Sequence, residues 1–132
     1  MTKKKILIVE DDQDMRRALN VRLRANNYDT AFASDAIEAL SIARKEQPDL
    51  LLLDLGLPGG DGFMVMDRMK DIASLSSLPV IVVSARDSEG NKDRALSAGA
   101  EAFFQKPVDN EQLIAAIRHT LGDADQVSPI TV

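Results

Sequence analysis

Short apolar runs alternate along this chain with longer segments in which apolar residues recur every three or four positions. The apolar runs predict strands over residues 5–10, 28–33, 49–55, 79–85 and 101–105. The helical spacing predicts helices over residues 12–26, 35–46, 88–98 and 109–121, and one more that begins near residue 61. Strands joined by helices indicate an α/β domain with a parallel sheet covered by helices on both faces.

Polar residues mark where several of these helices begin and end. Ser34 or Asp35 can cap the second helix, and Asp61 can cap the third. Gly99 is expected to act as the C-cap of the polar helix over residues 88–98. The apolar stripe of the first helix is expected to include Ala18. The regular pattern stops after residue 121, so residues 1–121 are predicted to form one domain and residues 122–132 a tail or the start of a linker.

The composition indicates an ordinary globular protein, with 45% hydrophobic and 28% charged residues among 132. No cysteine is present, so disulfides and thiolate metal sites are excluded. No run reaches the roughly 18 apolar residues of a membrane span, and the run at residues 6–9 is too short for a signal peptide. We therefore expect a cytoplasmic protein without membrane contact. The net charge of −5, with a single basic run at residues 3–5, argues against direct nucleic-acid binding.

Polar and charged residues follow the predicted strands at their carboxyl ends. Residues 10–12 (Glu-Asp-Asp) end the first strand, Asp54 the third, Ser84 the fourth and Lys106 the fifth. In an open parallel sheet the carboxyl ends of the strands share one edge, where functional groups gather. The sequence therefore predicts one site that combines carboxylates, a hydroxyl group and an amine.

This set of groups suits phosphoryl transfer assisted by a divalent cation. Clustered carboxylates repel one another, and ligands that are all oxygen favour Mg²⁺, with Mn²⁺ as an alternative, over zinc. A metal ion and Lys106 would neutralise charge on a moving phosphoryl group. Asp54 could be the nucleophile and form an acyl phosphate.

Four motifs, "ILIVEDDQDMRR", "LLLDLGLPGGDG", "IVVSA" and "FFQKP", occur in this order on the predicted strands. Together they resemble the receiver (CheY-like) domain of two-component response regulators, over about residues 4–121. The resemblance implies a doubly wound (βα)5 flavodoxin-like sheet with strand order 2-1-3-4-5. It also implies a signalling module that phosphorylates itself and slowly loses the phosphoryl group, without turnover of an external substrate.

The resemblance assigns the acceptor and the metal ligands. Asp54 would accept the phosphoryl group from a phosphohistidine of a sensor histidine kinase or a histidine phosphotransfer protein. Asp54 and Asp11 would bind Mg²⁺ directly, Glu10 would bind it through water, and the backbone carbonyl of Gly56 would be a further ligand. Glycine at position 56 is expected to let that carbonyl approach the metal. Asp12 is assigned mainly to the N-terminus of the first helix.

The resemblance also assigns the phosphoryl contacts and the switch. Ser84, Lys106 and the backbone of Ala85 would contact the phosphoryl oxygens, and Phe103 would swing inward as Ser84 moves. The face made by the fourth helix, fifth strand and fifth helix would then change and signal to an output domain or downstream protein. From its position and charge alone, we hypothesise that Arg86 reaches toward the phosphoryl group and slows attack by water.

Several positions depart from common family patterns. Phe103 replaces the tyrosine of many relatives, so no hydroxyl group is available there. Glu101 is followed by Ala102 where transcription-factor relatives usually carry two acids. A phosphorylation-dependent homodimer of that class is therefore only weakly indicated. The type of output stays open.

The same residues allow other interpretations. Taken singly, Asp54 could be a turn acid, Ser84 a strand-end hydroxyl and Lys106 a plain surface lysine. A pseudo-receiver would be a binding scaffold without phosphorylation, and the intact acids, Ser84 and Lys106 argue against it. A haloacid-dehalogenase-like phosphatase would need a second acid two residues after the nucleophile, where Gly56 stands. The single histidine, His119, is expected on the surface of the last helix, far from the site.

Overall fold

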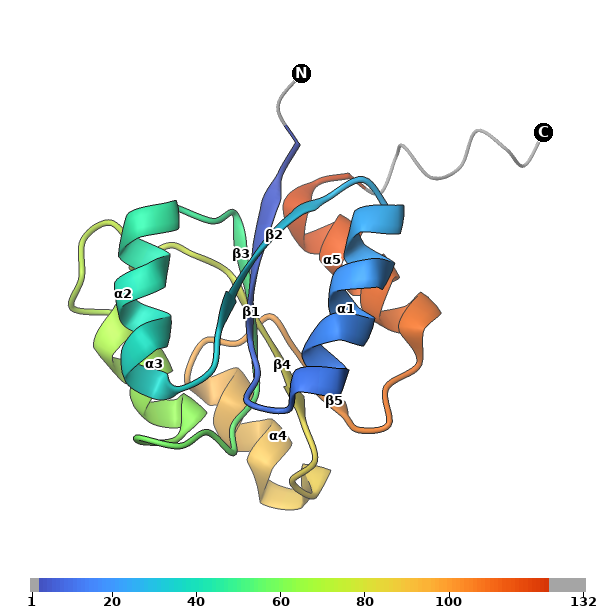
Figure 1. Ribbon diagram of the computed structural model, residues 1–132. Coiled ribbons are helices and arrows are strands. Elements are labelled where there is room, and N and C mark those ends of the chain that lie inside the picture. The colour runs from blue at the N-terminus through green and yellow to red at the C-terminus, as the bar shows by residue number, and fades with distance from the viewer. Residues whose placement is uncertain (1–2, 124–132) are drawn as a thin grey trace.

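The structure is a computed structural model that describes residues 3–123, and its centre is a five-stranded parallel sheet. The strands are β1 (Lys5–Val9), β2 (Asp29–Ala33), β3 (Leu50–Leu53), β4 (Val80–Ser84) and β5 (Ala102–Gln105). The helices are α1 (Gln13–Ala25), α2 (Ala36–Glu46), α3 (Gly62–Met69), α4 (Ser88–Ser97) and α5 (Asn110–Leu121). The strand order β2-β1-β3-β4-β5 confirms the predicted doubly wound fold. Figure 1 shows α1 and α5 on one face of the sheet and α2, α3 and α4 on the other.

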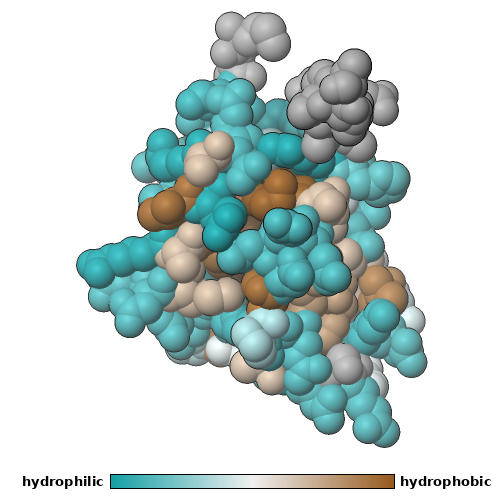
Figure 2. Space-filling view, turned by 90° about the vertical axis from the view of Figure 1, so that its right-hand side faces the viewer, coloured by the Kyte–Doolittle hydropathy of each residue, from teal (hydrophilic) through white to brown (hydrophobic). Residues whose placement is uncertain are grey.

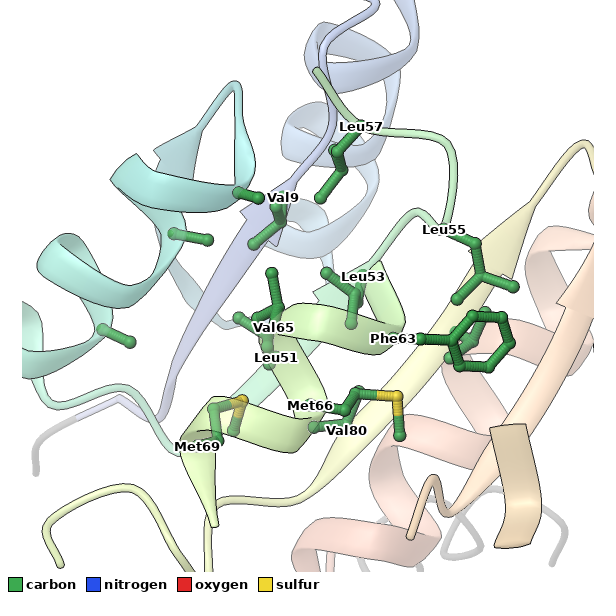
Figure 3. Close-up of a cluster of buried hydrophobic side chains, with 14 of the residues drawn as sticks. Val9, Leu51, Leu53, Leu55, Leu57, Phe63, Val65, Met66, Met69 and Val80 are labelled. Atoms are coloured by element: carbon green, nitrogen blue, oxygen red, sulfur yellow. The ribbon is translucent and has the colours of Figure 1, made fainter. Parts of the chain in front are cut away.

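The central strands fill two separate hydrophobic clusters with alternating residues. In β1, Leu7 and Val9 face the cluster under α2 and α3, whereas Ile6 and Ile8 face the cluster under α1 and α5. Figure 3 shows the first cluster, in which the side chains of α3 point toward those of β3 and β4. A strand that is buried on both faces has apolar residues at every position. This explains the continuous apolar run at residues 50–53, which are all leucine.

Aspartates cap the N-termini of all five helices. Their side chains accept hydrogen bonds from backbone N–H groups at the start of each helix, and these N-caps are Asp12, Asp35, Asp61, Asp87 and Asp109. The structure therefore selects Asp35 over Ser34 as the cap of α2. It also confirms that the carboxylate of Asp12 is occupied by the start of α1.

Two predictions about the helices were wrong in detail. Ala18 is exposed, because the buried stripe of α1 is narrower than predicted and its fully buried members are Leu19 and Leu23. The helix over residues 88–98 is interrupted near its start, where Gly90 has φ +78. Its C-cap is Ala98, and Gly99 follows it with φ +108, a conformation that glycine adopts without a steric penalty.

The chain remains attached to the domain for two residues after α5. Gly122 caps the helix, and Asp123 accepts hydrogen bonds from Lys4 Nζ at 3.1 Å and from Tyr28 Oη at 3.0 Å. The rest of the predicted tail, residues 124–132, lies outside the described residues.

The side of the molecule that carries α1 and α5 is mainly hydrophilic, with separate apolar residues between the polar ones (Figure 2). Within residues 3–123, no helix is long and apolar enough to cross a membrane.

Candidate functional site

The predicted site residues meet at the carboxyl edge of the sheet. Glu10 and Asp54 directly follow β1 and β3, Ser84 ends β4, and Lys106 directly follows β5. Backbone hydrogen bonds continue the strand pairing to these positions, from Asp54 N to the carbonyl of Val9 and from Lys106 N to the carbonyl of Ser84. The register of the sheet therefore fixes the spacing of the functional groups.

Two of the carboxylates and the hydroxyl group are buried. Glu10 is 2% exposed, Asp54 is 7% exposed and Ser84 is fully buried. Buried carboxylates are costly unless they are paired with a cation or accept hydrogen bonds. Their burial argues against the interpretation of Asp54 as a turn acid, because a turn acid would be expected in solvent.

Lys106 provides the positive charge for both buried carboxylates. Its ammonium group donates to Glu10 Oε1 at 2.5 Å and to Asp54 Oδ2 at 3.2 Å. Glu10 Oε2 accepts from the backbone N–H of Asp12, and Asp54 Oδ1 accepts from the backbone N–H of Gly56. Lys106 is therefore part of the site and not a plain surface lysine.

Three carboxylates are close enough to share a metal ion. Oxygen atoms of Glu10, Asp11 and Asp54 all lie within 4.8 Å of one another, and Asp11 is exposed. The donor set is entirely oxygen, which fits Mg²⁺ better than zinc. Lys106 alone does not balance three acids, so a divalent cation would relieve the remaining repulsion. The residues therefore fit the predicted metal.

The protonation equilibria reflect this crowding. Burial raises the pKa of Glu10 above its usual value, the nearby Asp54 raises it further, and the hydrogen bond from Lys106 opposes both effects. Burial alone would lower the pKa of Lys106, but its hydrogen bond to Glu10 and the charge of Asp54 outweigh burial and raise it. Lys106 thus stays charged while it holds the two acids.

The loop between β3 and α3 is shaped by a glycine that the sequence did not single out for this role. A Cβ atom at Gly62 would lie 2.8 Å from the carbonyl oxygen of Asp54 and 3.0 Å from Leu55 Cα. The N–H of Gly62 donates to the carbonyl of Leu55 at 2.9 Å and closes the loop. Because the backbone of residues 54 and 55 approaches this position so closely, only glycine fits without a shift of the chain. The signal in the sequence that could have indicated this role is a glycine at the first position of a helix.

Gly56 has no close protein neighbour on the side where a side chain would project. A Cβ atom at this position would lie 3.9 Å from Asp54 Oδ1, which is ordinary van der Waals contact. The assignment of its backbone carbonyl as a metal ligand stays a prediction.

The remaining predicted residues surround the site. The hydroxyl oxygen of Ser84 accepts from the backbone N–H of Arg86 at 3.2 Å, and Ala85 is exposed at the rim. The guanidinium group of Arg86 lies 3.7 Å from Asp61 Oδ2, so this structure pairs it with the N-cap of α3. Phe103 is half-buried against the cluster under α2 and α3, and its predicted inward movement stays a prediction.

Two smaller features complete the site. Arg16 donates to the carbonyl of Glu10 at 2.9 Å, a contact between α1 and the end of β1 that the sequence did not reveal. The peptide bond between Lys106 and Pro107 is cis.

Comparison with known proteins agrees with this geometry. A model of the response regulator receiver domain matches residues 6–118. The polar-differentiation response regulator DivK of Brucella anthropi is 36% identical over 121 residues, which are 92% of this chain and 98% of that protein. The response regulator PleD of Caulobacter vibrioides is 37% identical over 114 residues, which are 86% of this chain and 25% of PleD. The chain therefore spans a quarter of the length of PleD.

Solved structures share the fold. A CheY-like receiver domain protein from Methanospirillum hungatei has a TM-score of 0.84 and 28% identity, and the match covers 95% of this chain and 98% of that one. The receiver domain of a sensor histidine kinase from Pseudomonas aeruginosa has a TM-score of 0.83 and 25% identity, covering 92% and 99% of the two chains. That structure holds a magnesium ion coordinated in its active site cleft.

Proposed function

The chain belongs to the response regulator receiver domain family, and on this premise we propose that it is a phosphorylatable switch in which Asp54 is the acceptor. The observation that carries the proposal is the buried pair Glu10 and Asp54, bridged by Lys106 and joined by Asp11. A binding scaffold has no need to bury two carboxylates at the edge of its sheet. A site that receives a phosphoryl group needs a nucleophile, a fixed cation and an open metal position.

The proposed reaction is a simple displacement at phosphorus. A carboxylate oxygen of Asp54 attacks the phosphorus atom of a phosphohistidine, the P–N bond breaks, and the imidazole nitrogen keeps the electron pair. The acyl phosphate is later hydrolysed. Water attacks phosphorus, the bond between phosphorus and the Asp54 oxygen breaks, and inorganic phosphate and the Asp54 carboxylate are released. No external substrate is turned over, so the domain is not an enzyme in the usual sense.

The protein groups would hold the phosphoryl group and offset its charge. Lys106 already lies 3.2 Å from Asp54 and would pair with a phosphoryl oxygen on that carboxylate. Ser84 and the backbone of Ala85 would donate hydrogen bonds to the other oxygens. When bound by Asp11, Asp54, the Gly56 carbonyl and, through water, Glu10, Mg²⁺ or Mn²⁺ would supply further neutralisation of the transition state.

The proposed output is a change of surface. A new dianion on Asp54 would draw Ser84 toward it, Phe103 would fill the space behind, and the face of α4, β5 and α5 would rearrange. The donor would be a histidine kinase or a histidine phosphotransfer protein, and the receiver of the signal an output domain or another protein. A homodimer that depends on phosphorylation and a cytoplasmic location both stay predictions.

Intact mass spectrometry tests the acceptor. Wild-type protein and the Asp54→Asn variant are incubated with acetyl phosphate and Mg²⁺, and we expect the wild type alone to gain one phosphoryl group. Asp61→Asn is the matched control, because this acid lies in the same loop but serves as a helix cap. Equal modification of the Asp54→Asn variant would remove Asp54 as acceptor. No modification of the wild type, with Mg²⁺ binding measured separately, would favour the pseudo-receiver scaffold.

The lifetime of the acyl phosphate tests Arg86. In this structure Arg86 lies beside Asp61, so it would have to leave that carboxylate to shield the phosphoryl group. We expect Arg86→Ala to lose the phosphoryl group faster than the wild type. An unchanged rate would rule out this role.

A further inference from the structure

The groove between α2 and α3 combines an apolar floor with an unbalanced positive charge. Its apolar lining is Ile37, Leu40 and Met64, and its cations are Arg44, Lys45 and Arg68. The groove has a volume of about 600 Å³, within the range of about 300–1,000 Å³ of typical binding pockets. α2 and α3 lie next to each other on the left of Figure 1, away from the carboxyl ends of β4 and β5.

The exposed isoleucine is the first unusual feature. Ile37 is 69% exposed, although α2 otherwise turns its apolar residues toward the sheet. Leu40 and Met64 are half-buried and pack against the core cluster. Together they place one projecting apolar side chain beside an apolar floor, which is the arrangement that anchors a helix in a groove.

The charge of the groove is opposite to that of the whole chain. The chain carries a net charge of −5, yet the three charged residues that line the groove are all basic. Among residues 3–123, no carboxylate lies within 4.0 Å of Arg44, Lys45 or Arg68. These cations are therefore available to an acidic ligand.

We propose that this groove is a docking site for an amphipathic helix of a partner protein, whose apolar stripe is flanked by acidic residues. The projecting Ile37 would enter between apolar side chains of the partner, and the cations would pair with its carboxylates. This site is separate from the carboxylates around Asp54, and its occupation does not require phosphorylation.

Other occupants fit the observations less well. Contacts to nucleic-acid phosphates would make no use of an apolar floor, and the acidic chain would repel a polyanion outside the groove. Adsorption to a membrane needs a broad apolar face, whereas Ile37 is the single strongly exposed apolar residue of α2. A second copy would need an acidic helix, and each of the five helices carries at least one arginine or lysine.

Another groove, between α1 and α5, does not share these properties. It contains Glu111 as well as Arg22 and Arg118, and Arg118 already donates to Asn26 Oδ1 at 2.8 Å. Two arginines and one glutamate leave this groove one net positive charge, against three in the groove between α2 and α3. Figure 2 shows this side of the molecule as mostly hydrophilic.

An NMR titration tests the proposal with unphosphorylated protein, so its outcome is independent of the function of Asp54. The probe is a synthetic peptide of about 15 residues with leucines at helical spacing and glutamates elsewhere. We expect shifts confined to α2 and α3 at low salt and weaker binding at higher salt. A control peptide with lysine in place of glutamate should not bind.

Matched variants locate the contact. Ile37→Asp and Arg44→Glu should each weaken peptide binding at least about tenfold, which is about 1.4 kcal/mol. Val21→Asp is the control, because Val21 is also 69% exposed but lies on α1, and it should bind like the wild type. Circular dichroism confirms that each variant is folded, and Arg44→Gln provides a milder change if the charge reversal unfolds the protein.

Three results would overturn the proposal. The first is the absence of peptide shifts on α2 and α3, or unchanged affinity in Arg44→Glu. The second is binding of the wild type, but not of Arg44→Glu, to vesicles that contain phosphatidylglycerol, which would identify an anionic membrane as the occupant. The third is self-association that Ile37→Asp abolishes, measured by sedimentation, which would identify a second copy.

Discussion

Replacing Lys106 by methionine should destabilise the domain far more than the same change at an ordinary ion pair. The substitution keeps a long, flexible side chain but removes the charge that contacts Glu10 and Asp54. Lys5→Met is the matched control, because Lys5 also forms an ion pair, at 2.9 Å with Glu46, but the side chains of both members of that pair are one-third exposed. The comparison separates the loss of a buried counter-charge from the loss of a lysine.

The expected magnitude follows from the geometry of the two carboxylates. Their oxygen atoms lie within 4.8 Å of each other, and at an effective dielectric constant of 20 this repulsion is about 3.5 kcal/mol. Protonation of Glu10 limits the cost. The ordinary pKa of this carboxyl group is 4.5. At about 1.4 kcal/mol per pH unit, protonating it at pH 7 costs about 3.4 kcal/mol, and the destabilisation cannot exceed this value. Lys106→Met should therefore cost about 3 kcal/mol, and Lys5→Met less than about 1 kcal/mol.

The pH dependence has a definite sign. Loss of the lysine raises the pKa of Glu10 further in the folded state, because burial and Asp54 then act without opposition. A folded carboxyl group with a raised pKa binds more protons than the unfolded chain above pH 4.5, so stability falls as the pH rises. The gap between Lys106→Met and the wild type should be small near pH 4.5 and should grow toward pH 7.

Urea unfolding at several pH values, with and without Mg²⁺, measures these effects. Because Lys106 repels a metal ion, Mg²⁺ should stabilise Lys106→Met more than the wild type. The reasoning would be refuted if Lys106→Met cost no more than Lys5→Met. It would also be refuted if Mg²⁺ stabilised both proteins equally.

Three further predictions, two of them with a matched control variant, test other parts of the structure. Gly62→Ala should cost about 2 kcal/mol or more in urea unfolding, because its Cβ atom would meet backbone atoms, whereas Gly56→Ala should cost less than about 1 kcal/mol. The wild type should lose stability as the pH rises from 10 to 12, and Tyr28→Phe should lack this loss. Burial and a carboxylate partner raise the pKa of Tyr28 from 10.0 to about 12, so its stabilisation of up to about 3 kcal/mol is present below pH 10 and lost as the pH rises. Asp11→Asn should weaken Mg²⁺ binding in a fluorescence or calorimetric titration, and Asp12→Asn should leave it nearly unchanged because Asp12 caps α1.

The sequence predicted the sheet and the site edge well, because both depend on strong, local signals. Continuous apolar runs such as residues 50–53 locate buried strands, and the polar residues that follow them must lie at one edge. The assignment of Asp12 to the start of α1 was also accessible, since the start of a helix requires a capping side chain.

Other features depend on contacts that no local pattern contains. The role of Gly62 arises from the path of the backbone at Asp54, whose carbonyl oxygen lies close to where a Cβ atom of residue 62 would be. The exposed position of Ala18 depends on how α1 rotates against the sheet. The pairing of Arg86 with Asp61 joins two loops that are distant in the sequence, so charge alone suggested a different partner.

The two hydrophobic clusters divide the domain in a way that bears on its evolution. Ile6 and Leu7 are consecutive in the chain, yet they belong to opposite sides of the sheet. The helices on one side of the sheet therefore pack against different strand residues from the helices on the other side. The surface of α2 and α3 can diverge between descendants of a common ancestor while α1 and α5 keep their packing. The carboxylates are held at the strand ends, between the two sides, so the chemistry can be inherited unchanged while the helices are exchanged one side at a time.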